Sequence, residues 1–138
     1  MTENKINREM AESEFDRFME TMGVEYDEST LDAESISEFK AHRERIVKAI
    51  ERGSFVVNDE GEGVFTPEKT QLPDGGKITF HEPTGETVQA TDNGKAGKPV
   101  AKIHYALAQL TKQPVQTFVK LHMKDYKVCQ SVITLFLA

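Results

Sequence analysis

The sequence predicts an α+β fold with N-terminal helices, a small antiparallel β-sheet or hairpins in the middle, and a C-terminal helical bundle. Apolar residues recur at helical spacing near both ends of the chain. Between these regions, short β-branched and aromatic runs are separated by turns rich in Gly and Pro. A chain of 138 residues is of single-domain size. We expect one compact domain with an arm, divided into an acidic helical arm (1–53), a β-hairpin region with a flexible linker (54–98) and a C-terminal helical region (99–138).

Two helices are predicted in the first segment. The first spans 8–22 and ends at Gly23, a residue suited to a helix C-cap, and its apolar face carries Met10, Phe15, Phe18, Met19 and Met22. The second opens with Ser35 and Glu38, which have the spacing of a capping box, and ends at Gly53. Along one side it would carry Phe39, Arg43, Ile46, Val47 and Ile50.

The residue pattern of the middle segment is typical of strands and turns. Four strands are predicted, over 55–57, 64–66, 77–80 and 86–90. A hairpin turn at 58–62 joins the first pair, and the turn His81–Gly85 joins the second pair. Residues 91–98 read as a flexible polar connector. The chain is then helical to its end, with Pro99 in a first turn, a junction at Gln113-Pro114 and a third pattern beginning near Asp125.

Charge and composition limit the classes of function. The net charge of −6 is uneven: residues 1–69 carry 18 acidic and 9 basic side chains (−9), whereas residues 70–138 carry 5 and 8 (+3). The lysines of the second half are dispersed, so nucleic-acid binding is not expected. One cysteine allows no internal disulfide and suits a reducing compartment. No secretion signal or membrane-spanning apolar run is seen, which predicts no membrane association.

The residues that most often carry chemistry lack a catalytic or ligating pattern. The acidic turn 58–62 lacks the ligand order of a calcium loop, and the histidines His42, His81, His104 and His122 lack metal-ligand spacing. Cys129 lies on an apolar helical face with Val132 and Ile133, which predicts a buried, unreactive thiol. We therefore predict no catalytic residue, no cofactor and no metal, and expect that the protein is not an enzyme.

The run from Ile78 to Leu137 resembles the phage tail assembly chaperones of contractile and long noncontractile tailed phages. The resemblance begins at Phe80-His81-Glu82-Pro83-Thr84-Gly85, which matches a "Phe or Leu, acidic, Pro" element. It continues through apolar and turn positions of the helical tail: Leu107, Leu110-Thr111-Lys112, Phe118, Leu121, Asp125, Val128, Val132, Phe136 and Leu137. Lys112 departs from the pattern, because a small residue such as Gly is common there.

The resemblance implies a non-enzymatic chaperone in the host cell cytoplasm that binds the phage tape-measure protein and tail tube proteins. A homo-oligomer is compatible with it. An apolar helical groove with a charged rim could shield a tape-measure helix. The expected partner-binding residues are Leu107, Leu110, Phe118, Leu121, Asp125, Tyr126 and Phe136. Two other classes fit the sequence: a small structural virion protein of the tail or connector, and an acidic inhibitor that mimics nucleic acid to bind a host protein.

Overall fold

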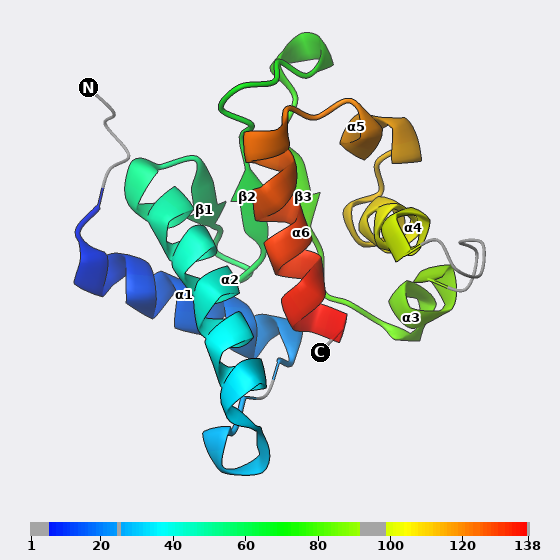
Figure 1. Ribbon diagram of the computed structural model, residues 1–138. Coiled ribbons are helices and arrows are strands. Elements are labelled where there is room, and N and C mark those ends of the chain that lie inside the picture. The colour runs from blue at the N-terminus through cyan, green and yellow to red at the C-terminus, as the bar shows by residue number, and fades with distance from the viewer. Residues whose placement is uncertain (1–5, 25, 92–98, 138) are drawn as a thin grey trace.

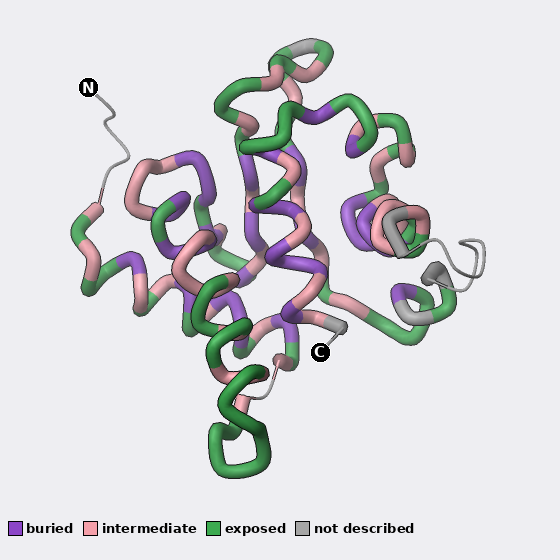
Figure 2. The backbone as a smooth tube through the Cα atoms, in the orientation of Figure 1, coloured by how far each residue is buried: buried purple, intermediate pink, exposed green. Residues whose placement is uncertain are grey.

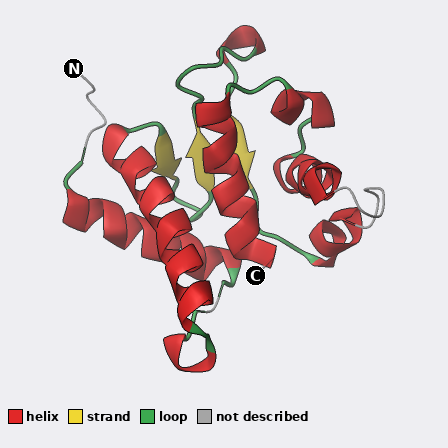
Figure 3. Ribbon diagram, in the orientation of Figure 1, coloured by secondary structure: helices red, strands yellow, loops and turns green. Residues whose placement is uncertain are grey.

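The structure is a computed structural model that describes residues 6–24, 26–91 and 99–137. The chain begins with two helices, α1 (Arg8–Met22) and α2 (Ala33–Arg52), joined through the 3₁₀ turn Glu28–Thr30. Three strands follow, β1 (Phe55–Val57), β2 (Gly63–Phe65) and β3 (Ile78–Phe80), with a second 3₁₀ turn, Pro73–Gly75, before β3. The remaining helices are α3 (Gly85–Thr91), α4 (Pro99–Thr111), α5 (Val115–Val119) and α6 (Met123–Leu137) (Figures 1 and 3). The α+β prediction is confirmed.

The first two helices begin and end at polar and glycine caps. Helix α1 starts after Asn7, whose side chain accepts from the Met10 N–H, and ends at Gly23 in the left-handed conformation (φ 75°), as predicted. The predicted capping box of α2 is wrong. The N-cap is Asp32, whose carboxylate accepts from the Ser35 N–H at 2.8 Å, so Ser35 lies inside the first turn. Helix α2 ends at Gly53, as expected.

The strands form an antiparallel meander in the order β1-β2-β3. Alternation puts one face inward, where Phe55, Phe65, Ile78 and Phe80 are fully buried. Gly63 lies opposite Phe80 in this sheet. A Cβ at Gly63 would come within 2.3 Å of the Phe55 ring, so glycine is required for the rings to close over the strand.

The turn between β1 and β2 is a hairpin, as predicted. The Asn58 side-chain oxygen accepts from the N–H groups of Glu60 and Glu62, and the Asn58 N–H donates to the Glu62 carbonyl at 2.8 Å. Arg17 of α1 donates to the carbonyls of Val57 and Asn58. This contact protects the outer edge of β1 from pairing with another chain.

The fourth predicted strand, 86–90, is wrong, because this segment is helix α3. The Thr84 hydroxyl accepts from the Glu86 N–H, and the Thr84 N–H donates to the Thr87 hydroxyl at 3.2 Å. These local bonds satisfy backbone groups at the helix start, which outweighs the alternating polarity of the sequence. Most of the predicted connector, 92–98, lies outside the described residues.

The three helical patterns of the C-terminal region are confirmed as α4, α5 and α6. Helix α4 ends at Lys112, the one non-glycine residue with positive φ (58°) in the described part of the chain. Pro114 then provides the extended residue from which α5 begins. A φ of 58° is one that glycine adopts without strain, so Lys112 holds a backbone conformation that is unfavourable for its residue type.

One core joins the first helix to the last. The Phe18 ring lies 5.2 Å from that of Phe55 and 5.6 Å from that of Phe136, while Phe55 and Phe80 stack at 6.0 Å. The segment predicted to be an acidic arm packs into this core: α2 lies beside α6, and buried residues of α1 and α2 belong to the same cluster (Figures 1 and 2).

Among the described helices, none has the length and apolarity that crossing a membrane would need.

Candidate partner-binding groove

The structure places most of the predicted partner-binding residues in the core. Leu107, Leu110, Phe118, Leu121 and Asp125 are each at least nine-tenths buried. Their side chains contact other parts of the same chain, so they offer no surface to a partner in this conformation. Tyr126 and Phe136 are half-buried, and both pack against the core. Phe136 also lines a surface hollow of about 770 Å³.

The Asp125 side chain connects α6 to the β2–β3 connection by hydrogen bonds. Its two carboxylate oxygens accept from the backbone N–H groups of Glu68, at 2.7 Å, and Lys69, at 2.9 Å. These bonds tie the β2–β3 connection to the first turn of α6. The Thr70 hydroxyl adds a third tie by accepting from the His122 N–H. Asp125 is only 1% exposed, and its position near a helix N-terminus suits a negative charge.

A serine–histidine pair lies between α2 and α6. The Ser131 hydroxyl is 3.0 Å from Nδ1 of His42 and also accepts from Arg45 at 2.9 Å. Burial, reinforced by the charge of Arg45, lowers the pKa of His42. Ser131 has no exposed surface, so a substrate carbonyl cannot reach its hydroxyl. The cluster therefore joins two helices.

Cys129 is fully buried as predicted, and burial raises the pKa of its thiol.

Two adjoining hollows form a groove that is built mainly by the N-terminal segment. One part, of about 730 Å³, lies between α1 and α2, and the other, of about 770 Å³, lies between the α1–α2 connection, α2 and the end of α6. Both parts share Val24, Tyr26 and Phe39. We call this surface the groove. Its apolar floor consists of Phe15, Met19, Val24, Tyr26, Phe39, Leu135 and Phe136.

An aromatic pair stands between the two parts of the groove. The rings of Tyr26 and Phe39 stack with centroids 3.6 Å apart and planes within 11°. Both side chains are half-buried, so they combine fixed positions with accessible ring surface. Rigid aromatic side chains lose little conformational entropy on binding and are frequent at the centres of protein interfaces. This pair is therefore a candidate anchor for a partner.

The rim of the groove is predominantly acidic. Asp16, Glu20, Glu28 and Glu44 border the first part, and Asp27 and Glu38 border the second. Two cations also line it: Lys40 lies 3.8 Å from Glu28, and Arg43 pairs with Glu12 while lying over the Phe15 ring. The rim is therefore acidic around an apolar floor.

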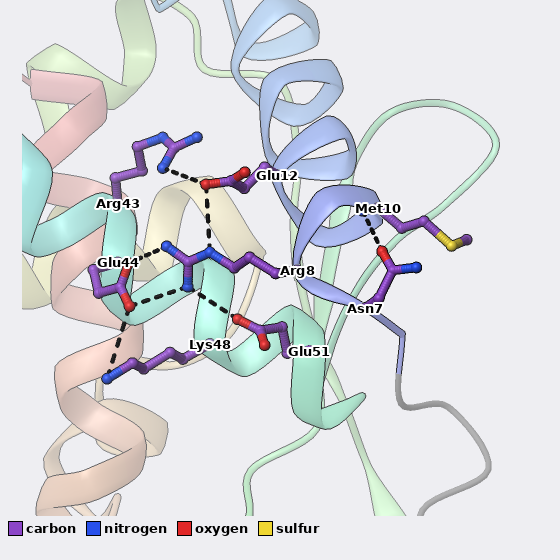
Figure 4. Close-up of polar contacts among 8 residues, drawn as sticks. All are labelled: Asn7, Arg8, Met10, Glu12, Arg43, Glu44, Lys48 and Glu51. Atoms are coloured by element: carbon purple, nitrogen blue, oxygen red, sulfur yellow. Dashed lines mark hydrogen bonds and ion pairs between the residues drawn. The ribbon is translucent and has the colours of Figure 1, made fainter.

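Behind the rim, an ion-pair network holds α1 against α2. Arg8 bonds to Glu12 of its own helix and to Glu44 and Glu51 of α2, and Lys48 also pairs with Glu44 (Figure 4). The hydrogen bonds from Arg8 hold the pKa of the Glu44 carboxyl below its ordinary value. These contacts join the start of α1 to α2 beside the first part of the groove, which Glu44 also lines.

The sequence pointed to the C-terminal helices as the candidate surface, whereas the groove is built mainly by the N-terminal segment. The longest apolar runs lie in the C-terminal helices, and such runs fill the core. The available signals for the groove were Tyr26, an aromatic residue inside a strongly acidic connector, and Phe39, which precedes the main apolar stripe of its helix. Both are large apolar residues with charged neighbours in the sequence, a pattern that differs from the continuous apolar faces of the core helices.

No cluster of His, Cys, Asp or Glu among the described residues could hold a metal ion. Comparison of the chain with protein-family models, with curated proteins and with solved structures finds no match. The groove is therefore interpreted from its own geometry and chemistry.

Proposed function

We propose that this protein is a non-enzymatic chaperone of bacteriophage tail assembly that binds the tape-measure protein in the host cytoplasm and assists assembly of the tail tube. The observation that carries the proposal is the groove, whose aromatic floor and charged rim suit the apolar stripe of a helix. A tape-measure protein is a long helical chain, and its apolar stripes would aggregate if left bare. A small protein that covers such a stripe would keep it soluble.

The C-terminal half supports the same proposal through its resemblance to tail assembly chaperones. Lys112 lies at the position where those proteins commonly have a small residue, and its φ of 58° is one that glycine adopts without strain. The acidic inhibitor receives less support, because several carboxylates of the first half are already paired with arginines of the same chain.

The direct test is binding of the full chain to a purified, helical fragment of the tape-measure protein from the same phage, measured by isothermal titration calorimetry. We expect Phe39→Ser to weaken binding about tenfold or more, since it removes one ring of the stacked pair. The matched control is Val119→Ser on α5, where the side chain is 51% exposed and distant from the groove lining. Thermal unfolding of each variant establishes that it is folded.

The possible results separate the claims. If the unaltered chain does not bind the fragment, the tape-measure proposal fails. If the chain binds but Phe39→Ser and Val119→Ser bind equally well, the chaperone function stands and the groove is excluded as its site. Abundant protein in purified phage particles would favour the structural virion class instead.

A further inference from the structure

A second hollow lies at the opposite end of the α2–α6 pair. Helices α2 and α6 lie side by side and run in opposite directions (Figure 1), so the end of α2 meets the start of α6. The hollow between them has a volume of about 430 Å³. Its charged lining is entirely cationic, formed by Arg45, Arg52, Lys124 and Lys127, with His122 beside them. We call it the basic cleft.

The cations of this cleft are only partly neutralised within the chain. Arg52 and Lys124 share one carboxylate, that of Glu68, at 2.9 and 3.7 Å. Within the described residues, neither Arg45 nor Lys127 forms an ion pair. Local charge balance therefore leaves the cleft positive on a protein whose net charge is −6.

One of these cations is held in place before any ligand arrives. The guanidinium of Arg45 donates through Nη1 to the hydroxyl of Ser131, which has no exposed surface. The other N–H groups of Arg45 make no hydrogen bond within the described part of the chain. A fixed guanidinium with free donors loses little side-chain entropy when it binds a carboxylate.

We propose that the basic cleft binds a short acidic segment of a partner protein, with carboxylates on the cationic walls and an apolar side chain on Met123. Met123 lines the cleft and is 61% exposed, the largest exposure among the large apolar residues of the described chain. Arg45 and Arg52 lie two turns apart on α2, or about 10 Å at 1.5 Å per residue. About three residues of extended chain span that length, enough for two or three carboxylates.

A nucleic acid fits this surface less well. A duplex carries a charge about every 1.7 Å of its axis, and its affinity depends on neutralising many phosphates along a continuous basic face. The cationic surface extends about 10 Å along α2, and Glu44 and Glu51 lie on the same helix. A long polyanion would therefore extend past the cationic surface and find few further cations along α2, whereas a short peptide fits within the cleft.

The test uses the full chain and a fluorescently labelled peptide of alternating glutamate and leucine, with binding followed by anisotropy at low salt. We expect Lys124→Glu with Lys127→Glu to weaken binding about tenfold, because two attractive contacts become repulsive. The matched control is Lys77→Glu with Lys102→Glu, which changes the net charge equally at exposed sites outside the cleft. The control should retain the affinity of the unaltered chain.

Several results would overturn the proposal. The first is that the cleft variant binds the peptide as tightly as the unaltered chain. The second is that the cleft and control variants lose the same affinity for the peptide. The third is that oligothymidylate displaces the labelled peptide at a concentration similar to that of unlabelled peptide. The proposal also fails if the peptide does not bind and the chain self-associates through Lys124 and Lys127. In that case the cleft binds a second copy of this chain. Should the double variant fail to unfold cooperatively, Lys127→Gln provides the test, with a loss of about threefold expected. None of these measurements depends on the tape-measure protein, so the two proposals can fail separately.

Discussion

Replacing Asp125 by Asn tests whether this residue serves the fold rather than a partner. Its carboxylate accepts two backbone N–H groups, from Glu68 and Lys69, and is 1% exposed. An amide oxygen can keep one of these bonds, but the amide NH₂ then faces the other N–H group. One charge-assisted hydrogen bond is lost and a buried donor is left without an acceptor.

The expected cost follows from these two changes. A hydrogen bond to a charged group contributes ~1.5–3 kcal/mol. Loss of the negative charge in the first turn of α6 adds ~0.3–1 kcal/mol. We therefore expect Asp125→Asn to lower the free energy of unfolding by about 3 kcal/mol. For a domain of this size, that corresponds to a fall in Tm of about 10 °C.

Urea denaturation followed by circular dichroism measures the loss, and Asp16→Asn is the matched control, since Asp16 is exposed and undergoes the same chemical change. Hydrogen exchange of the Glu68 and Lys69 amides gives a local readout, because both should lose protection. A change of less than about 1 kcal/mol with unaltered exchange at these amides would refute the structural role. If the variant remained stable but lost partner binding, Asp125 would belong to an interface, as the family resemblance implied.

Three further predictions follow from local geometry. Lys112→Gly should raise the free energy of unfolding by about 0.5–1 kcal/mol by relieving the left-handed backbone, as measured by urea denaturation; a destabilised variant would contradict this account. Gly63→Ala should destabilise the protein by about 2 kcal/mol or more, because the added Cβ would overlap the Phe55 ring. Gly85→Ala is the control, since a Cβ at Gly85 meets open space, and its urea unfolding midpoint should be close to that of the unaltered protein. Equal unfolding midpoints for the two variants would argue against the packing described. Burial lowers the pKa of His42 in the folded state below its ordinary value of 6.5. The contribution of neutral His42 to stability is therefore fully present above pH 6.5 and is lost as the pH falls through the folded-state pKa. Between pH 7.5 and pH 5.5 the Tm of the unaltered chain should fall further than that of His42→Gln, and equal falls in Tm would exclude the effect.

The sequence was sufficient for the parts of the fold that depend on local signals. Gly23 and Gly53 marked two helix ends, because a left-handed terminal residue strongly favours glycine. The hairpin at 58–62 followed from its turn residues, and the helical junction followed from Pro114. In each of these cases one or two residues determine the backbone, so no knowledge of distant contacts is needed.

Prediction failed where two local patterns competed or where distant segments meet. The segment 86–90 alternates in polarity like a strand, but the bonds between Thr84 and Thr87 begin a helix there. The groove could not be predicted from spacing, because its floor combines side chains from α1, the α1–α2 connection, α2 and α6. The same long-range packing explains why the expected C-terminal binding surface lies largely in the core.

The aromatic contacts that join α1, the sheet and α6 restrict how this protein can be divided for experiments. A fragment containing only residues 78–137 would lose the rings of Phe18 and Phe55, which lie against Phe136 and Phe80 respectively. Such a fragment would expose those rings to solvent and adhere to many apolar proteins. Its apparent binding would then reflect broken packing rather than recognition. The shortest piece suitable for interaction studies therefore includes both α1 and α6.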